Sequence, residues 1–289
     1  MTTSDRLLSV LGLFTLEHPE WTVESAAKEL DLAISTAYRY FRSLAKAGLI
    51  VAFSAGRYVL GPAIIQYDRQ MRLSDPLTTT AQATMKRLAQ KLPPKTLVML
   101  CRLFRNQVMC VHQEAEKTPH FAVSYERGRL MPLFRGAASK IILAHMAPRT
   151  VKSLYTKHAV EFAQAGLGVS WDEVKPRLRD LRLAGVAITQ GEIDPGLTGI
   201  AVGLFEPGET VIGSLSVVMT VQARSPRVAA ATIKALRAGS AQIGWALSQL
   251  ATGQGSPAAV ASRAAALKPS RSRPEVSPSS KRRRPSKAR

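Results

Sequence analysis

The most constraining feature of the chain is the stretch 35–50, STAYRYFRSLAKAGLI, which has the pattern of a short amphipathic helix. Its apolar residues recur at spacings of three and four and form one stripe, made of Ala37, Phe41, Leu44 and Ala45. Ser35 can cap the helix because its hydroxyl can accept a backbone N–H of the first turn. Gly48 stands where a helix commonly ends with a left-handed residue. The stretch therefore predicts a helix that begins at Ser35 and ends before Gly48.

Two further helices are predicted before this stretch, and a short link joins the second of them to it. Apolar residues repeat with helical spacing over 4–16, and Thr22 can cap a helix over 23–30. The four residues 31–34 then lead directly into the next helix. Two helices joined by such a tight turn are typical of a helix-turn-helix, whose second helix enters the major groove of DNA.

A hairpin is predicted after the third helix. Residues 49–53 and 57–60 are β-rich runs, and the small residues between them have the composition of a turn. Three helices followed by a hairpin, in this order and at these lengths, predict a winged helix-turn-helix.

The polar face of the third helix carries the residues that are expected to contact DNA. Residues at the start of a recognition helix point at base edges, so four side chains are expected to read sequence, namely Ser35, Thr36, Tyr38 and Arg39. Two basic residues farther along the helix, Arg42 and Lys46, are expected to meet phosphates. Arg57 on the hairpin is expected to add a contact to a phosphate or to the minor groove. The plain alternative is a solvated helix face, and Tyr40 is expected to pack in the core.

The charge of the chain favours a polyanionic partner. Forty Lys and Arg against twenty Asp and Glu give a formal net charge of +20. Residues 252–289 are rich in Lys, Arg, Ser and Pro, contain no aromatic residue and have Glu275 as their single acid. Such a segment buries too little apolar surface to fold alone. It is expected to add either salt-dependent affinity for DNA or solubility.

Several other classes of protein find no support in the sequence. Cys101 and Cys110 form no CxxC motif and no cluster at metal-ligand spacing, and no P-loop or dinucleotide motif is present, so no cofactor or metal is expected. The chain has no apolar run long enough for a transmembrane helix and no signal-peptide pattern. A cytoplasmic protein without membrane contact is therefore expected.

The remainder of the chain predicts an α+β domain. A connecting helix is expected over 63–73, and Asp75 followed by Pro76 should begin another helix. Strands are expected at 96–103, 107–114, 186–190, 198–205 and 211–219, with 120–125 as a further candidate. Helices are expected from Gly136, from the capping box that begins at Ser170, and from Ser225 to about residue 250. Strands flanked by helices in this way predict one sheet with helical cover.

Two parts of this domain suggest a site for a small anion. The residues 136–138 open a helix, and the amides and dipole of a helix N-terminus favour an anion. Alternating serines on a late strand point to one face of the sheet. The expected backbone and polar lining consists of Gly136, Ala137, Ala138, Thr198, Gly199, Ser214 and Ser216, and the expected apolar walls are Met99, Met131 and Leu133. The plain alternatives are a turn glycine and ordinary strand polarity.

Four segments, in this order, resemble motifs of the IclR family of bacterial transcriptional regulators, namely 35–50, 56–64, 128–146 and 191–218. The first resembles the recognition helix of the family, and the second resembles its wing followed by the connecting helix. The third resembles a segment with a Pro-Leu pair before a Lys-bearing helix, and the fourth resembles the closing motif. The resemblance extends over about residues 4–250, so the basic tail lies outside it.

The resemblance implies a regulator with a winged helix-turn-helix at 1–61, a connecting helix at 62–75 and a GAF-like effector domain at 76–250. The composition adds a disordered tail at 251–289. The resemblance also implies a homodimer formed through the N-terminal region, often a tetramer, that binds operator DNA. A small organic acid, aromatic in some members, is the implied effector. The chain departs from the family pattern at Asp31, Phe134, Gly199 and Val218. Asp31 can still adopt the left-handed turn, whereas the other three make the expected pocket less polar.

Two alternatives remain open at the level of sequence. The first is a DNA-binding oligomer that no longer responds to a ligand, because its pocket has lost polar residues. The second is an enzyme that uses Cys110 and His112, which are two apart on a predicted strand and should share a face. A thiol nucleophile also needs an activating base and an oxyanion site, and no further residue converges there. A non-enzymatic regulator is therefore the favoured interpretation.

Overall fold

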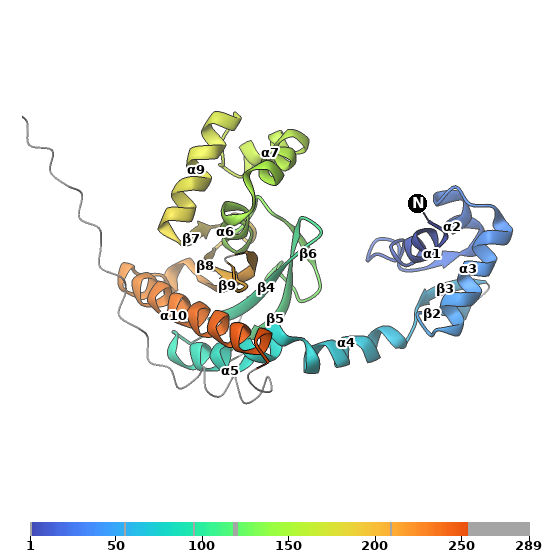
Figure 1. Cartoon of the computed structure of the whole chain (residues 1–289), viewed down its shortest axis with the longest axis horizontal. Helices are drawn as coiled ribbons and strands as arrows, with labels where there is room; N and C mark the ends of the chain where they lie inside the picture. The colour runs from blue at the N-terminus through green and yellow to red at the C-terminus, as the bar shows by residue number, and fades with distance from the viewer. Residues whose placement is uncertain (1, 55, 95, 118–120, 209, 254–289) are drawn as a thin grey trace, which may run out of the picture.

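The computed structural model of the chain describes residues 2–54, 56–94, 96–117, 121–208 and 210–253. An N-terminal unit and a larger C-terminal unit are connected by one helix, α4 (Ala63–Ser74), as Figure 1 shows. Most of the predicted tail, residues 254–289, lies outside the described residues.

The N-terminal unit is a winged helix-turn-helix, as predicted. Its elements are α1 (Thr3–Leu11), β1 (Trp21–Thr22), α2 (Val23–Glu29), α3 (Ile34–Lys46), β2 (Ile50–Ser54) and β3 (Arg57–Leu60). The three strands pair in the order β1-β3-β2. A single cluster that includes Tyr40, Phe41 and Leu44 packs the helices together. Burial of Tyr40 confirms that this tyrosine belongs to the core rather than to the polar face.

The turn between α2 and α3 explains where α3 begins. Asp31 adopts the left-handed region with φ of 49°, as expected for a residue that stands in the place of a glycine. The carbonyl of Ala33 already accepts hydrogen bonds from the amides of Thr36 and Ala37. Ala33 therefore holds the cap position, and Ile34 is the first helical residue. The prediction of Ser35 as the cap is wrong, because the chain enters helical geometry two residues earlier.

Asp75 caps α5 (Pro76–Lys91), which confirms the predicted Asp-Pro start. The Asp75 side chain accepts a hydrogen bond from the Thr78 amide, and Pro76 occupies the first helical turn, where its missing N–H costs nothing. The preceding helix α4 buries none of its residues within the chain. Few contacts thus fix the orientation of α4 between the two units.

The C-terminal unit contains a six-stranded antiparallel sheet. Its strands are β4 (Leu97–Phe104), β5 (Gln107–Glu114), β6 (Leu130–Pro132), β7 (Ala187–Gln190), β8 (Leu197–Phe205) and β9 (Val211–Thr220). They pair in the order β6-β5-β4-β9-β8-β7. Five of the strands match the predicted runs.

The candidate strand at 120–125 is wrong. His120 lies outside the described residues, and 121–125 form no strand. Hydrogen bonds from other parts of the chain fix this segment instead, because the Ser124 amide bonds to Asp194 and the Tyr125 carbonyl accepts from Gln113. The strand at this edge of the sheet is β6, farther along the sequence.

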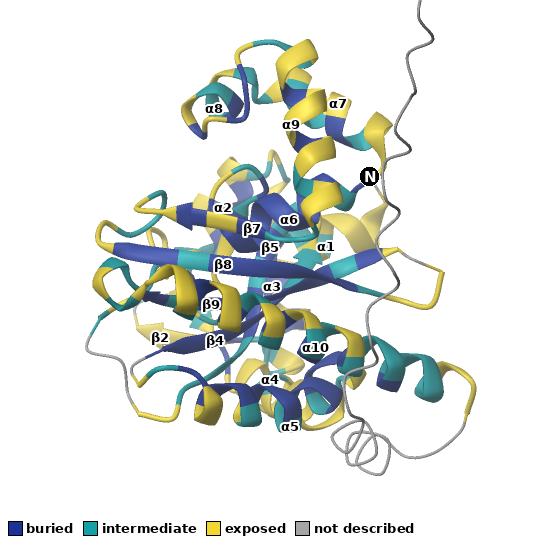
Figure 2. Cartoon of the chain, turned by 90° about the vertical axis from the view of Figure 1, so that its left-hand side faces the viewer, coloured by how far each residue is buried: buried dark blue, intermediate teal, exposed yellow. Residues whose placement is uncertain are grey.

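Helices cover both faces of the sheet (Figures 1 and 2). Helices α5 and α10 (Pro226–Ala251) pack on one face, while α6 (Ala137–His145) packs on the other with α9 (Trp171–Ala184) outside it. Two shorter helices that the sequence analysis did not assign, α7 (Pro148–Lys157) and α8 (Ala159–Gln164), lie beyond α6. The sheet therefore separates two apolar clusters, one against α6 and one against α5 and α10.

A β-bulge contradicts the prediction that the side chains of Cys110 and His112 share one face of the sheet. Cys101 pairs with Cys110, but Leu100 pairs with His112, so one extra residue stands in β5. The bulge reverses the alternation of side chains. Cys110 lies in the cluster against α6, whereas His112 lines a cavity beside α4 and α5. The two side chains do not share a face, and the thiol–imidazole site envisaged from the sequence is not formed.

Among the described residues, no helix is both long enough and apolar enough to cross a membrane.

Candidate functional site

The polar face of α3 is open to solvent. Its buried residues lie on the opposite face, and the exposed or half-exposed ones include all six helix residues that were predicted to contact DNA, namely Ser35, Thr36, Tyr38, Arg39, Arg42 and Lys46. The Arg39 guanidinium lies 5.9 Å from the centre of the Tyr40 ring, within the range of a cation–π contact. One continuous polar and basic face is therefore available to a nucleic acid.

Two acidic residues bind side chains that were predicted to contact DNA, one on α3 and one on the wing. The Tyr38 hydroxyl donates a hydrogen bond of 2.8 Å to Glu24 at the start of α2, and this bond raises the pKa of Tyr38 and lowers that of Glu24. On the wing, the guanidinium of Arg57 forms an ion pair with Glu20. A phosphate that bound Arg57 would have to compete with Glu20. The sequence analysis did not identify either acid.

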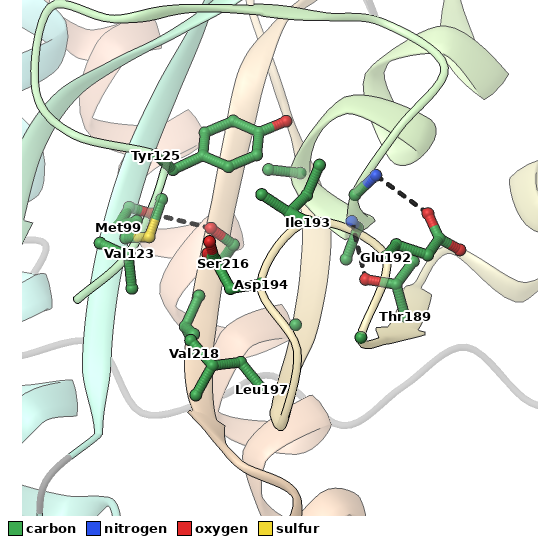
Figure 3. A pocket seen from close by; sticks show the side chains of 15 residues that line it. Met99, Val123, Tyr125, Thr189, Glu192, Ile193, Asp194, Leu197, Ser216 and Val218 are labelled. Carbon is green, nitrogen blue, oxygen red and sulfur yellow. Dashed lines mark hydrogen bonds between the residues drawn. The ribbon is translucent and has the colours of Figure 1, made fainter. Parts of the chain in front are cut away.

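A second candidate site lies in the C-terminal unit, at the N-terminus of α6. A cavity there is bounded by the sheet, by the segment 121–125 and by the loop 191–196 (Figure 3). Its lining consists of Met99, Val123, Tyr125, Gly136, Ala137, Ala138, Thr189, Gly191, Glu192, Ile193, Asp194, Leu197, Gly199, Ser216 and Val218. Polar atoms and an apolar wall thus meet at one helix end.

Two backbone amides of this helix end already have acceptors within the chain. Gly136 donates its N–H to the carboxylate of Glu192 at 3.1 Å, and Ala137 donates to the Thr189 hydroxyl at 3.1 Å (Figure 3). The second oxygen of Glu192 forms an ion pair with the buried Lys140 ammonium at 2.5 Å. The helix end therefore binds a carboxylate, which belongs to the protein itself.

Three side chains fasten the loop 191–196 over the cavity. Besides Glu192, the Asp194 carboxylate accepts a hydrogen bond of 3.0 Å from the Ser124 amide. Ile193 lies against Gly136, where an added Cβ would come within 3.1 Å of it. Gly191 and Gly196 flank these residues with φ of 64° and 77°, so the loop begins and ends at positions that suit glycine.

Tyr125 closes the cavity from the other side. Its hydroxyl donates to the carbonyl of Arg135 and is hydrogen-bonded to the Ser139 hydroxyl. Burial is the main cause that raises the pKa of Tyr125, so its phenol stays protonated at neutral pH.

The cavity is nearly filled in this conformation. Its volume is about 50 Å³, whereas sites for drug-sized ligands usually enclose roughly 300–1,000 Å³. A molecule the size of a benzoate would fit only after the loop 191–196 had moved.

The structure brings some of the predicted lining together and leaves the rest apart. Six predicted residues line the cavity, namely Met99, Gly136, Ala137, Ala138, Gly199 and Ser216, and four do not, namely Met131, Leu133, Thr198 and Ser214. Thr198 precedes Gly199 on β8, so its side chain points to the other face of the sheet. Ser214 shares the face of Ser216 but lies opposite Cys101, two residues earlier on β9.

Sequence reasoning missed the acidic loop and Tyr125. A signal for the loop was present, because 191–196 reads GEIDPG and places two acids between glycines just before a strand. No local pattern indicates that Tyr125 lies against Gly136, because the turn between the two residues and the packing of α6 decide that contact.

Family models match nearly all of the described chain. Residues 3–52 match the IclR helix-turn-helix domain, and residues 72–245 match the model described as bacterial transcriptional regulator IclR C-terminal. Together they cover the three N-terminal helices and most of the unit that contains the cavity, while residues 53–71, which include β3, lie between the two matches.

Individual proteins are similar at lower identity. The chain is 21% identical to the Pca regulon regulatory protein of Pseudomonas putida, over 75% of this chain and 74% of that protein. An IclR family transcriptional regulator from Brucella abortus matches with a TM-score of 0.68 and 18% identity, over 84% of this chain and 91% of that one. An IclR homolog from Microbacterium hydrocarbonoxydans, complexed with 4-hydroxybenzoate, matches with a TM-score of 0.65 and 21% identity, over 85% and 99%.

Proposed function

The chain belongs to the IclR family of bacterial transcriptional regulators, and on that premise we propose that a small organic acid modulates its affinity for an operator. The observation that carries the proposal is the carboxylate of Glu192, which is bound by the α6 N-terminus and Lys140 beside a lined cavity. Groups that bind one carboxylate can bind another when the first one leaves.

We propose that α3 enters the major groove and that its first turns read bases. Ser35, Thr36, Tyr38 and Arg39 are the readers in this proposal, because they lie near the start of the helix on its exposed face. Arg42, Lys46 and Arg57 bind phosphates and set the register. The hydrogen bond that Tyr38 donates to Glu24 would then fix the direction of one reading side chain.

The effector would enter by exchange with Glu192. Its carboxylate would take the Gly136 amide and Lys140, and its carbon skeleton would lie between Met99, Ile193 and Val218. The relative from Microbacterium hydrocarbonoxydans binds 4-hydroxybenzoate. An aromatic hydroxy acid is therefore the first ligand to test, since Asp194 and Ser216 offer oxygen acceptors to a hydroxyl.

A homodimer would complete the DNA-binding unit. Helix α4 buries no residue within the chain yet exposes several apolar side chains, namely Ile65, Tyr67, Met71 and Leu73. Tyr67 and Met71, which lie one turn apart on the same face of α4, form an exposed apolar pair that supports pairing of two copies next to the DNA. Further assembly to a tetramer remains part of the proposal.

Thermal unfolding of the full chain in the presence of graded concentrations of organic acids tests the proposed ligand. The panel should contain 4-hydroxybenzoate, benzoate and short aliphatic acids. A melting temperature that rises with ligand concentration is expected from mass action. A panel without effect would favour the second candidate, a ligand-independent DNA-binding oligomer, which the small cavity volume of about 50 Å³ supports.

A further inference from the structure

We propose that the junction of α4 with the C-terminal unit is a second anion site, for a small molecule that carries two negative charges. The site is a surface cavity of about 340 Å³, lined by Arg69, Arg72 and Leu73 of α4, Gln82 of α5, His112 of β5, and Arg127. This volume lies in the range of ordinary small-molecule sites. The cavity needs no rearrangement of the kind that the α6 cavity requires.

The charges around this cavity do not balance. Asp68 pairs with Arg72 at 3.2 Å and with Arg127 at 2.5 Å, so one carboxylate serves two guanidinium groups. The guanidinium of Arg69 has no hydrogen bond or ion pair among the described residues. Arg69 together with the Arg72–Asp68–Arg127 group thus carries a surplus of two positive charges. A dianion matches that surplus, and a guanidinium fork matches the geometry of a phosphate or carboxylate.

The remaining lining suits a small polar metabolite. The Gln82 amide can donate to an anionic oxygen, and the His112 ring, held at 2.9 Å by Glu114, adds a polar edge. Leu73 offers apolar contact to a short carbon skeleton. Phosphate monoesters and dicarboxylates share the required chemistry, which is two negative charges on a compact molecule.

The position of the site gives a bound ligand a regulatory effect. Half of the lining comes from α4 and half from the C-terminal unit, so a ligand would bridge the two. Because α4 buries no residue, such a bridge would add substantially to the contacts that orient the DNA-binding unit. This anion site is separate from the organic-acid site proposed for the α6 cavity, since the two cavities share no residue.

Isothermal titration calorimetry of the full chain with inorganic phosphate and with succinate, at constant ionic strength, tests the site. Saturable binding of one molecule per chain is expected for at least one probe, and the stronger one identifies the class. Arg69→Gln should weaken it about tenfold or more, since a charge-assisted contact is lost. Arg149→Gln is the matched control, because Arg149 is an exposed arginine on α7, outside the cavity.

Two results would overturn the proposal. Absent or non-saturable heats, or equal affinities in both variants, would mean that the highly basic chain attracts anions without a site. A change of oligomeric state in Arg69→Gln, seen by size-exclusion chromatography, would instead assign these arginines to a contact between protomers. Misfolding is not expected to obscure the result, because Arg69 is exposed and unpaired in the described chain.

Discussion

Glu192 accepts a hydrogen bond from the backbone N–H of Gly136 at 3.1 Å, and its other oxygen pairs with the Lys140 ammonium at 2.5 Å. The two residues are far apart in sequence, and their contact places a protein carboxylate at the amide end of α6. Both the closure of the cavity and its affinity for an acid would depend on this one side chain.

The first prediction concerns the charge of Glu192. Glu192→Gln keeps the size of the side chain but removes the charge that faces Lys140, so the free energy of unfolding should fall by about 1–3 kcal/mol. The same variant should bind an organic acid more tightly than the parent, because the internal competitor is weakened. Denaturant unfolding and ligand titration measure the two effects. Glu206→Gln changes an exposed acid elsewhere and is the control.

If Glu192→Gln were as stable as its control and bound acids no better than the parent, the exchange mechanism would be wrong. A loss of stability without a gain in acid affinity would leave Glu192 a structural role only.

The second prediction concerns the backbone at the helix start. Gly136 has φ of 81° and ψ of 152°, a conformation that is nearly exclusive to glycine, and an added Cβ would press on Ile193 and Tyr125. Gly136→Ala should therefore cost about 1–3 kcal/mol of stability. Gly166→Ala is the control, because Gly166 also has positive φ but its Cβ would meet nothing within 4 Å. Equal losses in the two variants, measured by chemical unfolding, would contradict the packing part of the argument.

The third prediction separates base reading from phosphate binding. Arg39→Ala should reduce discrimination between operator and random DNA by about 1–3 kcal/mol, because a base contact is lost. Arg42→Ala should weaken binding to both kinds of DNA alike. Fluorescence anisotropy with both DNAs, at several salt concentrations, measures the difference. An Arg39→Ala protein that discriminated as well as the parent would remove Arg39 from the readers.

The fourth prediction is a pH dependence from His145. In the folded state, burial lowers the pKa of His145 below its ordinary value of 6.5, and the nearby Arg182 charge makes a smaller contribution in the same direction. Just below pH 6.5, the folded chain therefore binds fewer protons at His145 than the unfolded chain does. The contribution of His145 to the free energy of unfolding is complete above that pH and is lost as the pH falls below it. His145→Gln should lack this component.

The check is denaturant unfolding of both proteins between about pH 7.5 and about pH 5. The stability gap between parent and variant should shrink as the pH falls. A gap that stayed constant would mean that His145 titrates as it does in the unfolded chain.

The parts of the fold that local chemistry decides could be predicted. Asp31 adopts the left-handed turn and Asp75 caps α5, because each role depends on neighbours in sequence. The alternation of apolar residues located five of the six strands of the C-terminal sheet.

Non-local contacts decide the rest. The 121–125 segment is held by Asp194 and Gln113 from distant parts of the chain, which no strand propensity reveals. The bulge in β5 separates Cys110 from His112, although their spacing alone places them on one face. Glu192 occupies the predicted anion position from a different loop, so the sequence indicated the anion preference of the helix end but not its occupant.

Operator affinity, measured as a function of effector concentration, tests the proposed regulation most directly. DNA fragments selected from genomic DNA by the full chain would serve as operator, and the dissociation constant would be measured with and without 4-hydroxybenzoate and the other acids of the panel. We expect that an acid which stabilises the protein also shifts operator affinity, and that Arg39→Ala discriminates the selected site from random DNA less well than the parent does. An acid that binds in the cavity but leaves the operator affinity unchanged would contradict it.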